Sequence, residues 1–109
     1  MAIISSDLLR GNFDTIVLAC LLDGKKYGNE IRKEIIAKTK ELFLPNEQSL
    51  YSAYHRLEEL GCVKGTWGSE LAGVTRKYYE ITEQGRQFYK SNVLAWQNAK
   101  KLIDILIEG

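Results

Sequence analysis

The fold of this chain is decided by the stretch PNEQSLYSAYHRLEELG, residues 45–61. Pro45 is the only proline, and Asn46 after it has a side chain that can accept a hydrogen bond from an unpaired amide of a first helical turn. An apolar stripe then repeats at steps of three and four, formed by Leu50, Ala53, Leu57 and Leu60. Gly61 follows as a stop. The stretch therefore predicts a helix that starts at Asn46 and ends before Gly61.

The opposite side of this helix carries hydrogen-bonding side chains. At about 100° per residue, the direction away from the apolar stripe is occupied by Gln48, Ser52, His55 and Glu59, with Tyr51 beside them. Glutamine can bond adenine through two hydrogen bonds, and His55 or Arg56 can donate to guanine or to phosphate. The pattern is typical of a helix that reads bases, although a merely solvated helix face has the same composition.

Two helices are expected before this one. Apolar residues recur at helical spacing over residues 7–22, and the pair Asp23-Gly24 ends that pattern. A shorter helix follows Tyr27-Gly28, with three isoleucines on one face. Residues 25–41 hold six Lys or Arg against three Glu, so the positive charge hidden in a net charge of +1 is concentrated here.

Residues 62–67 and 76–81 are short and β-prone, and the small residues 68–75 between them predict a loop. Together they predict a β-hairpin that brings three cations close to one loop: Lys64, Arg76 and Lys77. Such a basic hairpin is expected to hold a phosphate backbone. Four carboxylates reduce the general attraction to phosphate: Glu58, Glu59, Glu70 and Glu80.

Thr82 is expected to cap a last helix over residues 83–108, which is apolar on two sides and therefore needs two partners. Three helices, a hairpin and a long helix make a fold that is mainly α with a small β-hairpin, in the order of a winged helix-turn-helix. We therefore divide the chain into a winged helix-turn-helix DNA-binding domain, residues 1–82, and a C-terminal dimerisation helix, residues 83–109.

Composition fits one soluble globular domain, with 109 residues, 45% apolar and 27% charged. Two cysteines, Cys20 and Cys62, make neither a disulfide framework nor a metal-ligand spacing, so we expect small core residues, no metal and no cofactor. Trp67 is expected in the core or in hairpin packing. Residues 1–10 lack a basic run followed by a long apolar one, and no stretch approaches the roughly 20 apolar residues of a membrane span, so we expect a cytoplasmic protein.

An enzyme is not expected, because His55 is the only histidine and has no neighbouring nucleophile, and the glycines do not form a phosphate loop. The alternative function is a winged helix that contacts another protein without specific DNA binding, which the nearly neutral net charge would suit.

Several stretches together resemble the PadR-type transcriptional regulators, and they span nearly the whole chain. They are LRG at residues 9–11, YGNEI at 27–31, SLY at 49–51, RLE at 56–58 with Gly61, and RKYYEIT at 76–82 with Gly85. The single C-terminal helix is similar to the short branch of that family, above all to its multidrug-sensing repressors. Cys62 departs from the pattern, since the family usually has a larger aliphatic residue there.

The resemblance implies a homodimeric repressor that binds an inverted-repeat operator in double-stranded DNA and is released by a small planar aromatic effector. It also implies that Tyr51 and Lys77 touch phosphates. Our candidate DNA-binding residues are Gln48, Ser49, Tyr51, Ser52, His55, Arg56, Lys64, Arg76 and Lys77. The candidate dimer interface comprises Leu8, Leu9, Phe13, Val93, Trp96, Ile103 and Leu106. Trp96 is also the candidate ligand-binding residue, with simple packing as its alternative role.

Overall fold

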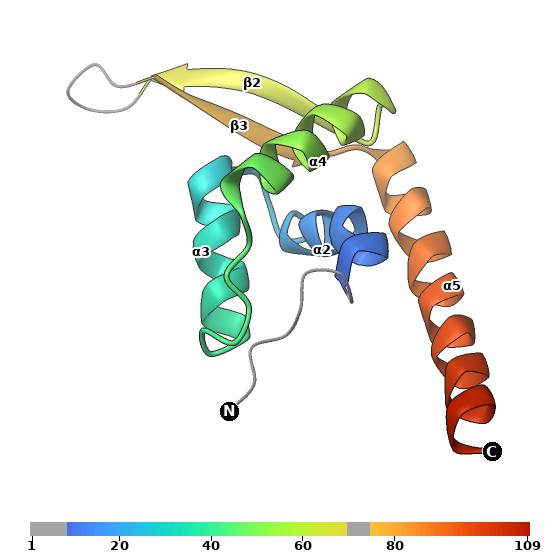
Figure 1. Cartoon of the computed structure of the whole chain (residues 1–109). Coiled ribbons are helices and arrows are strands. Elements are labelled where there is room, and N and C mark those ends of the chain that lie inside the picture. Colours follow the sequence, from blue (N-terminus) through green and yellow to red (C-terminus); the bar gives the residue numbers. More distant parts are fainter. Residues whose placement is uncertain (1–8, 70–74) are drawn as a thin grey trace.

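The helices and strands follow the predicted order in a computed structural model that describes residues 9–69 and 75–109. They are η1 (Arg10–Asn12), α2 (Phe13–Cys20), β1 (Lys26–Tyr27), α3 (Gly28–Lys38), α4 (Glu47–Glu59), β2 (Val63–Ser69), β3 (Thr75–Ile81) and α5 (Glu83–Glu108). The predicted fold class is confirmed, because α3 and α4 form a helix-turn-helix and β2 and β3 form a wing beside it (Figure 1).

The predicted starts of α4 and α5 are confirmed by their capping bonds. Oδ1 of Asn46 accepts from the amides of Gln48 and Ser49 at 2.8 Å and 3.2 Å, which begins α4. Oγ1 of Thr82 accepts from the amide of Gly85 at 3.0 Å and begins α5. Gly61 has a φ of +74° just after α4, a conformation that glycine adopts at no steric cost.

The sheet has three strands in the order β1-β3-β2, all antiparallel, so the predicted two-stranded hairpin lacked one strand. The missed strand is β1, in which Lys26 pairs with Tyr79 and Tyr27 with Tyr78. A strand of only two residues has no alternation that a sequence pattern could reveal. The wing strands are also longer than predicted, because β2 reaches Ser69 and β3 begins at Thr75.

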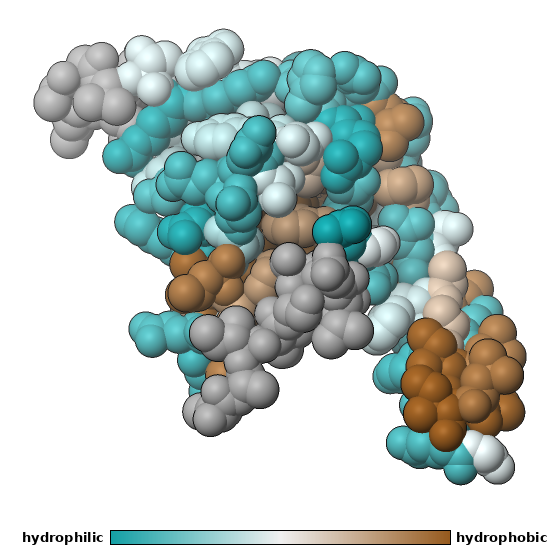
Figure 2. Space-filling model, in the orientation of Figure 1, coloured by the Kyte–Doolittle hydropathy of each residue, from teal (hydrophilic) through white to brown (hydrophobic). Residues whose placement is uncertain are grey.

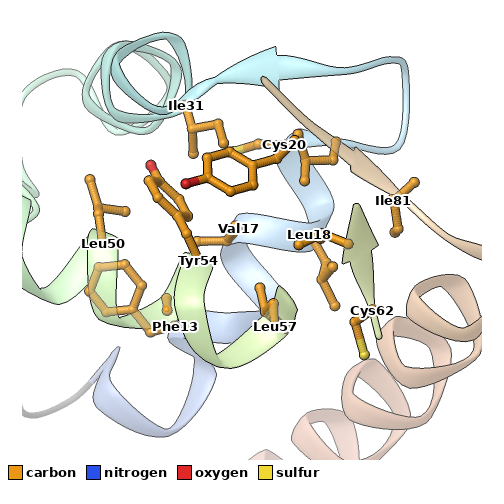
Figure 3. Packing of buried hydrophobic residues seen from close by; sticks show 14 of the residues in the cluster. Phe13, Val17, Leu18, Cys20, Ile31, Leu50, Tyr54, Leu57, Cys62 and Ile81 are labelled. Atoms are coloured by element: carbon orange, nitrogen blue, oxygen red, sulfur yellow. The ribbon is translucent and has the colours of Figure 1, made fainter. Parts of the chain in front are cut away.

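The first predicted helix is shorter than expected. Helix α2 covers only Phe13–Cys20, and a 3-10 turn with the weak helix formers Gly11 and Asn12 precedes it. The helix lies at the centre of the fold, where α3, α4 and the sheet pack around it (Figure 3). As a result, Val17, Leu18 and Leu21 are almost fully buried.

On α4, Leu50, Ala53 and Leu57 are buried as predicted, but Leu60 is 48% exposed and Tyr54 takes the remaining core position. The hydroxyl of Tyr54 donates to the carbonyl of Gly28 at 2.9 Å, which ties α4 to the start of α3.

Both cysteines are buried, in agreement with their predicted role as core residues. Burial, with a smaller contribution from the charge of Glu34, raises the pKa of the Cys20 thiol to about 12. Burial also raises the pKa of Cys62. Both thiols are therefore protonated at neutral pH and poorly nucleophilic.

Helix α5 leaves the body of the molecule. Its first turns pack on the core through Phe88 and Tyr89, whereas its C-terminal half stands clear of the other elements (Figure 1). Among the residues that the structure describes, no helix is long and apolar enough to cross a membrane.

Candidate nucleic-acid interface

The outward face of α4 is exposed along the helix. Gln48, Ser49, Ser52 and His55 all lie in solvent, and Tyr51 is 61% exposed. The face of the molecule made by α4 and the wing strands is mainly hydrophilic in Figure 2. These side chains are therefore placed where a ligand could meet them.

Arg56 differs from the other candidates on α4, because it is bound to another helix. Its Nε donates to Oδ2 of Asp14 on α2 at 2.9 Å, and Nη2 donates to Oδ1 of the same carboxylate. Such a bidentate pair fixes the orientation of a guanidinium. Arg56 thus braces α4 against α2, and only the N–H groups left over can reach DNA.

His55 is exposed but has a carboxylate partner one turn away. Its Nε2 lies 2.6 Å from Oε1 of Glu59. With the proton on Nε2 for this bond, Nδ1 of a neutral imidazole is an acceptor rather than a donor. An exposed pair of this kind is worth little energy, so DNA can displace Glu59.

The register of the wing separates its cations onto two faces. The pairs Val63–Ile81, Gly65–Tyr79 and Trp67–Lys77 share the face toward α4 and the core, and the pairs Lys64–Glu80, Thr66–Tyr78 and Gly68–Arg76 share the other. Lys77 therefore faces α4, whereas Lys64 and Arg76 face away from it. The three cations do not form the single cluster that their sequence positions suggested.

Each wing cation has a different environment. Lys64 is exposed, opposite Glu80 on β3. The guanidinium carbon of Arg76 lies 4.3 Å from the ring centroid of Tyr27, which is within the range of a cation–π contact. Nζ of Lys77 is 2.9 Å from Oε1 of Glu58.

Trp67 is 70% exposed, so its predicted place in the core is wrong. The alternative, packing within the hairpin, agrees with the structure, because Trp67 pairs with Lys77 of the facing strand, whose Nζ lies 5.9 Å from the Trp67 ring centroid. The face of the strand that Trp67 occupies is the core-facing one, but β2 and β3 project beyond the helices at this point (Figure 1). Strand alternation predicts which face a residue occupies, and it does not predict where the core ends.

Two grooves divide the candidate residues. A groove of about 560 Å³ between the start of α4 and α2 is lined in part by Gln48, Ser49, Ser52 and Arg56. A second, of about 500 Å³ between α4 and the wing, contains Tyr51, Arg76 and Lys77 together with Tyr27, Trp67 and Tyr79. His55 and Lys64 line neither groove. Sequence reasoning missed Tyr27 and Trp67 here, because their neighbours come from distant parts of the chain.

The residues predicted on the dimer interface fall into three groups. Leu9, Val93 and Trp96 line one apolar hollow of about 240 Å³ between α2 and α5. Ile103 and Leu106 are 47% and 81% exposed farther along α5. Phe13 is a core residue in edge contact with Phe43, which leaves it little surface for a second copy. Leu8 lies outside the described residues.

A helix-turn-helix with an antiparallel β wing beside it defines the class of winged helix-turn-helix proteins. In the parts of the chain that the structure describes, no group of three or more His, Cys, Asp or Glu could hold a metal ion.

Comparison with known proteins identifies the family. Residues 17–91 match the model of the transcriptional regulator PadR-like family. The chain is 36% identical over 106 residues to an uncharacterized protein of Lysinibacillus sphaericus, covering 97% of each chain.

Two solved structures agree with this family match. A transcriptional regulator from Clostridium thermocellum is 44% identical, with a TM-score of 0.87 over 95% of this chain and 98% of that one. A PadR family transcription regulator from Clostridium difficile is 27% identical, with a TM-score of 0.73 over 88% of this chain and 98% of that one.

The chain belongs to the PadR-like family of transcriptional regulators. This is a family of regulators rather than enzymes, and transcriptional regulation implies DNA binding. Membership therefore favours DNA over the alternative of a protein-contact domain.

Proposed function

We propose that the protein is a homodimeric repressor that binds an inverted-repeat operator, with α4 in the major groove and the wing on the sugar-phosphate backbone. The observation that carries this proposal is the groove between α4 and the wing, which is lined by Tyr51 on α4, by Lys77 on the facing side of β3 and in part by Arg76. A groove lined by cations and a hydroxyl suits a phosphate backbone. Repression follows if the bound dimer occupies DNA that RNA polymerase needs.

The dimer is supported by the apolar surface of α5. Exposed fractions of 60%, 64% and 77% at Leu102, Ile105 and Ile107 are high for side chains of this kind. Figure 2 shows a hydrophobic patch, in brown, at the C-terminal end of α5. A second copy related by a two-fold axis would cover this patch and present two α4 helices to two half-sites.

We assign base contacts to Gln48, Ser52 and His55, which project from α4. We assign phosphate contacts to Ser49, Tyr51 and the remaining candidates: Arg56, Lys64, Arg76 and Lys77. The two groups serve different purposes, since base contacts specify sequence and phosphate contacts fix position.

Replacing Gln48 by Ala and Arg76 by Ala should therefore have separable effects. Gln48→Ala is expected to cost about 1 to 3 kcal/mol on the operator and little on random duplex, because one base is no longer read. Arg76→Ala should weaken binding to both duplexes alike. It should also reduce the slope of log affinity against log salt concentration by about one phosphate contact per protomer.

Both effects can be measured by fluorescence anisotropy across a salt series, using an operator recovered by selecting bound fragments from the host genome. Equal losses on operator and random duplex for both variants would contradict the assignment of α4. Failure of the wild type to bind any duplex would favour the protein-contact function.

For the effector, we propose that Trp96 forms one wall of an aromatic ligand site at the dimer interface. Support comes from the apolar hollow that Trp96 lines with Tyr89 and Val93, since apolar hollows lined by aromatic rings bind planar molecules. Lys100, one turn away, should disfavour cations and admit neutral or anionic compounds.

The chain has two tryptophans, so Trp67→Phe leaves Trp96 as the only indole and Trp96→Phe leaves Trp67. We expect neutral or anionic planar dyes to quench the fluorescence of Trp96 in Trp67→Phe and to leave the fluorescence of Trp67 unchanged in Trp96→Phe. The same dyes should weaken operator binding by Trp67→Phe. Absence of quenching, or quenching without an effect on operator affinity, would leave Trp96 as a packing residue.

A further inference from the structure

One ion pair connects the DNA-reading helix directly to the wing. Oε1 of Glu58, in the last turn of α4, lies 2.9 Å from Nζ of Lys77 in the middle of β3. The two side chains are 34% and 29% exposed, so the pair is shielded from water more than an ordinary surface pair. The wing cation that faces α4 therefore already has a partner.

Gly65 makes room for this pair. Glycine weakens a strand interior, and its presence there commonly marks a close approach of other atoms. A Cβ atom at Gly65 would lie 2.5 Å from Cε of Lys77 and 2.7 Å from Oε2 of Glu58. The strand thus lacks a side chain at the point where the ion pair crosses it.

Two aromatic rings hold the ammonium from the sides. Nζ of Lys77 is 5.5 Å from the ring centroid of Tyr79 and 5.9 Å from that of Trp67. The hydrogen bond to Glu58 raises the pKa of Lys77, so the ammonium stays charged. Lys77 also keeps donors for a second partner, since an ammonium has three.

We infer that Glu58 determines specificity for DNA by retaining Lys77 against α4, so that the wing offers one free cation fewer to an arbitrary duplex. This inference rests on the proposed function. In a loosely held, non-specific complex the ammonium stays with Glu58, whose charge also repels phosphate. In the closely fitted operator complex a phosphate comes near enough to share Lys77 with Glu58. Glu58 thus lowers non-specific affinity more than operator affinity.

The test compares Glu58→Gln with Glu59→Gln in the full-length protein. Both remove one negative charge from the same helical turn, but only the first releases Lys77. Glu59→Gln instead frees His55, to which a base contact is assigned, so the two variants are compared on random duplex, where no base is read. One released cation adds one phosphate contact, which is worth about fivefold in affinity per protomer near 0.15 M salt. We expect Glu58→Gln to bind random duplex tighter by that amount and to lower the ratio of operator affinity to random-duplex affinity. The slope of log affinity against log salt concentration should become steeper by about one phosphate contact per protomer.

A double-mutant cycle separates release of Lys77 from a general change in charge. Lys77→Gln should reduce random-duplex affinity more in the Glu58→Gln background than in the wild type. Gly65→Ala, which keeps both charges but fills their space, should steepen the salt slope as Glu58→Gln does. Thermal unfolding curves identify any variant that is not folded.

The inference is overturned if Glu58→Gln and Glu59→Gln have equal effects, or if the cycle shows no coupling between Glu58 and Lys77. In either case salt-dependent binding by the wild type would leave the proposed function intact. If the wild type does not bind duplex DNA, both the proposed function and this inference fail.

Discussion

Replacing Ile103 and Leu106 together by Asp is expected to convert the protein from a dimer into a 12.4 kDa monomer. Both side chains are exposed, on an apolar stripe of α5 that also carries Val93, Trp96 and Ala99 at helical spacing. Each would contribute roughly 1.5 to 3 kcal/mol when buried, and a carboxylate placed in that contact opposes burial further. Losing the second half-site should lower operator affinity by about 10² to 10⁴ fold. Analytical ultracentrifugation at micromolar concentration measures the change in mass.

Gln97→Asp provides the control, because at about 100° per residue this position lies away from the stripe. It adds a charge to the same helix and should leave the dimer intact. A wild type that sediments only at 12.4 kDa would show that a second copy does not cover α5.

The second large effect is expected for Gly85→Ala at the start of α5. An added Cβ would overlap the carbonyl oxygen of Cys62 and lie 2.9 Å from its carbonyl carbon. This backbone cannot easily retreat, since the same oxygen accepts from the amide of Thr82 at 3.0 Å. We expect a loss of about 3 kcal/mol and a fall in melting temperature of more than about 10 °C.

Gly11→Ala is the matched control, because an added Cβ at Gly11 has no atom of the described residues within 4 Å. Thermal unfolding followed by circular dichroism compares the two. Equal melting temperatures for both variants would mean that α5 does not need this close contact.

Local signals in the sequence were sufficient for most of the helical framework. Asn46 and Thr82 each bond amides that follow them within three residues, so their effect is readable without any knowledge of the fold. The same holds for Gly61, whose positive φ ends a helix. Spacing alone likewise placed Leu50, Ala53 and Leu57 in the core.

The remaining features depend on which distant segments meet. Asp14 and Arg56 are 42 residues apart, and no local pattern pairs one carboxylate with one guanidinium across that distance. Lys77 was recognised as a wing cation, but its partner Glu58 is on another element. The one available signal was Gly65, an unusual residue for the middle of a strand. The sequence therefore predicted which residues make up the candidate site, but only part of how they are arranged relative to one another.

The junction between α4, the wing and α5 determines how movement would spread through the dimer. Thr82 alone separates β3 from α5, and its Oγ1 donates to the carbonyl of Gly61 at 2.7 Å. Nε2 of Gln84 donates to the carbonyl of Leu60 at 2.7 Å. The start of α5 is thus hydrogen-bonded to the end of α4, and the two helices should rotate together as one rigid unit. In the proposed dimer, a few degrees of change in the crossing angle of the paired α5 helices would alter the distance between the two α4 helices, and with it the operator spacing that fits.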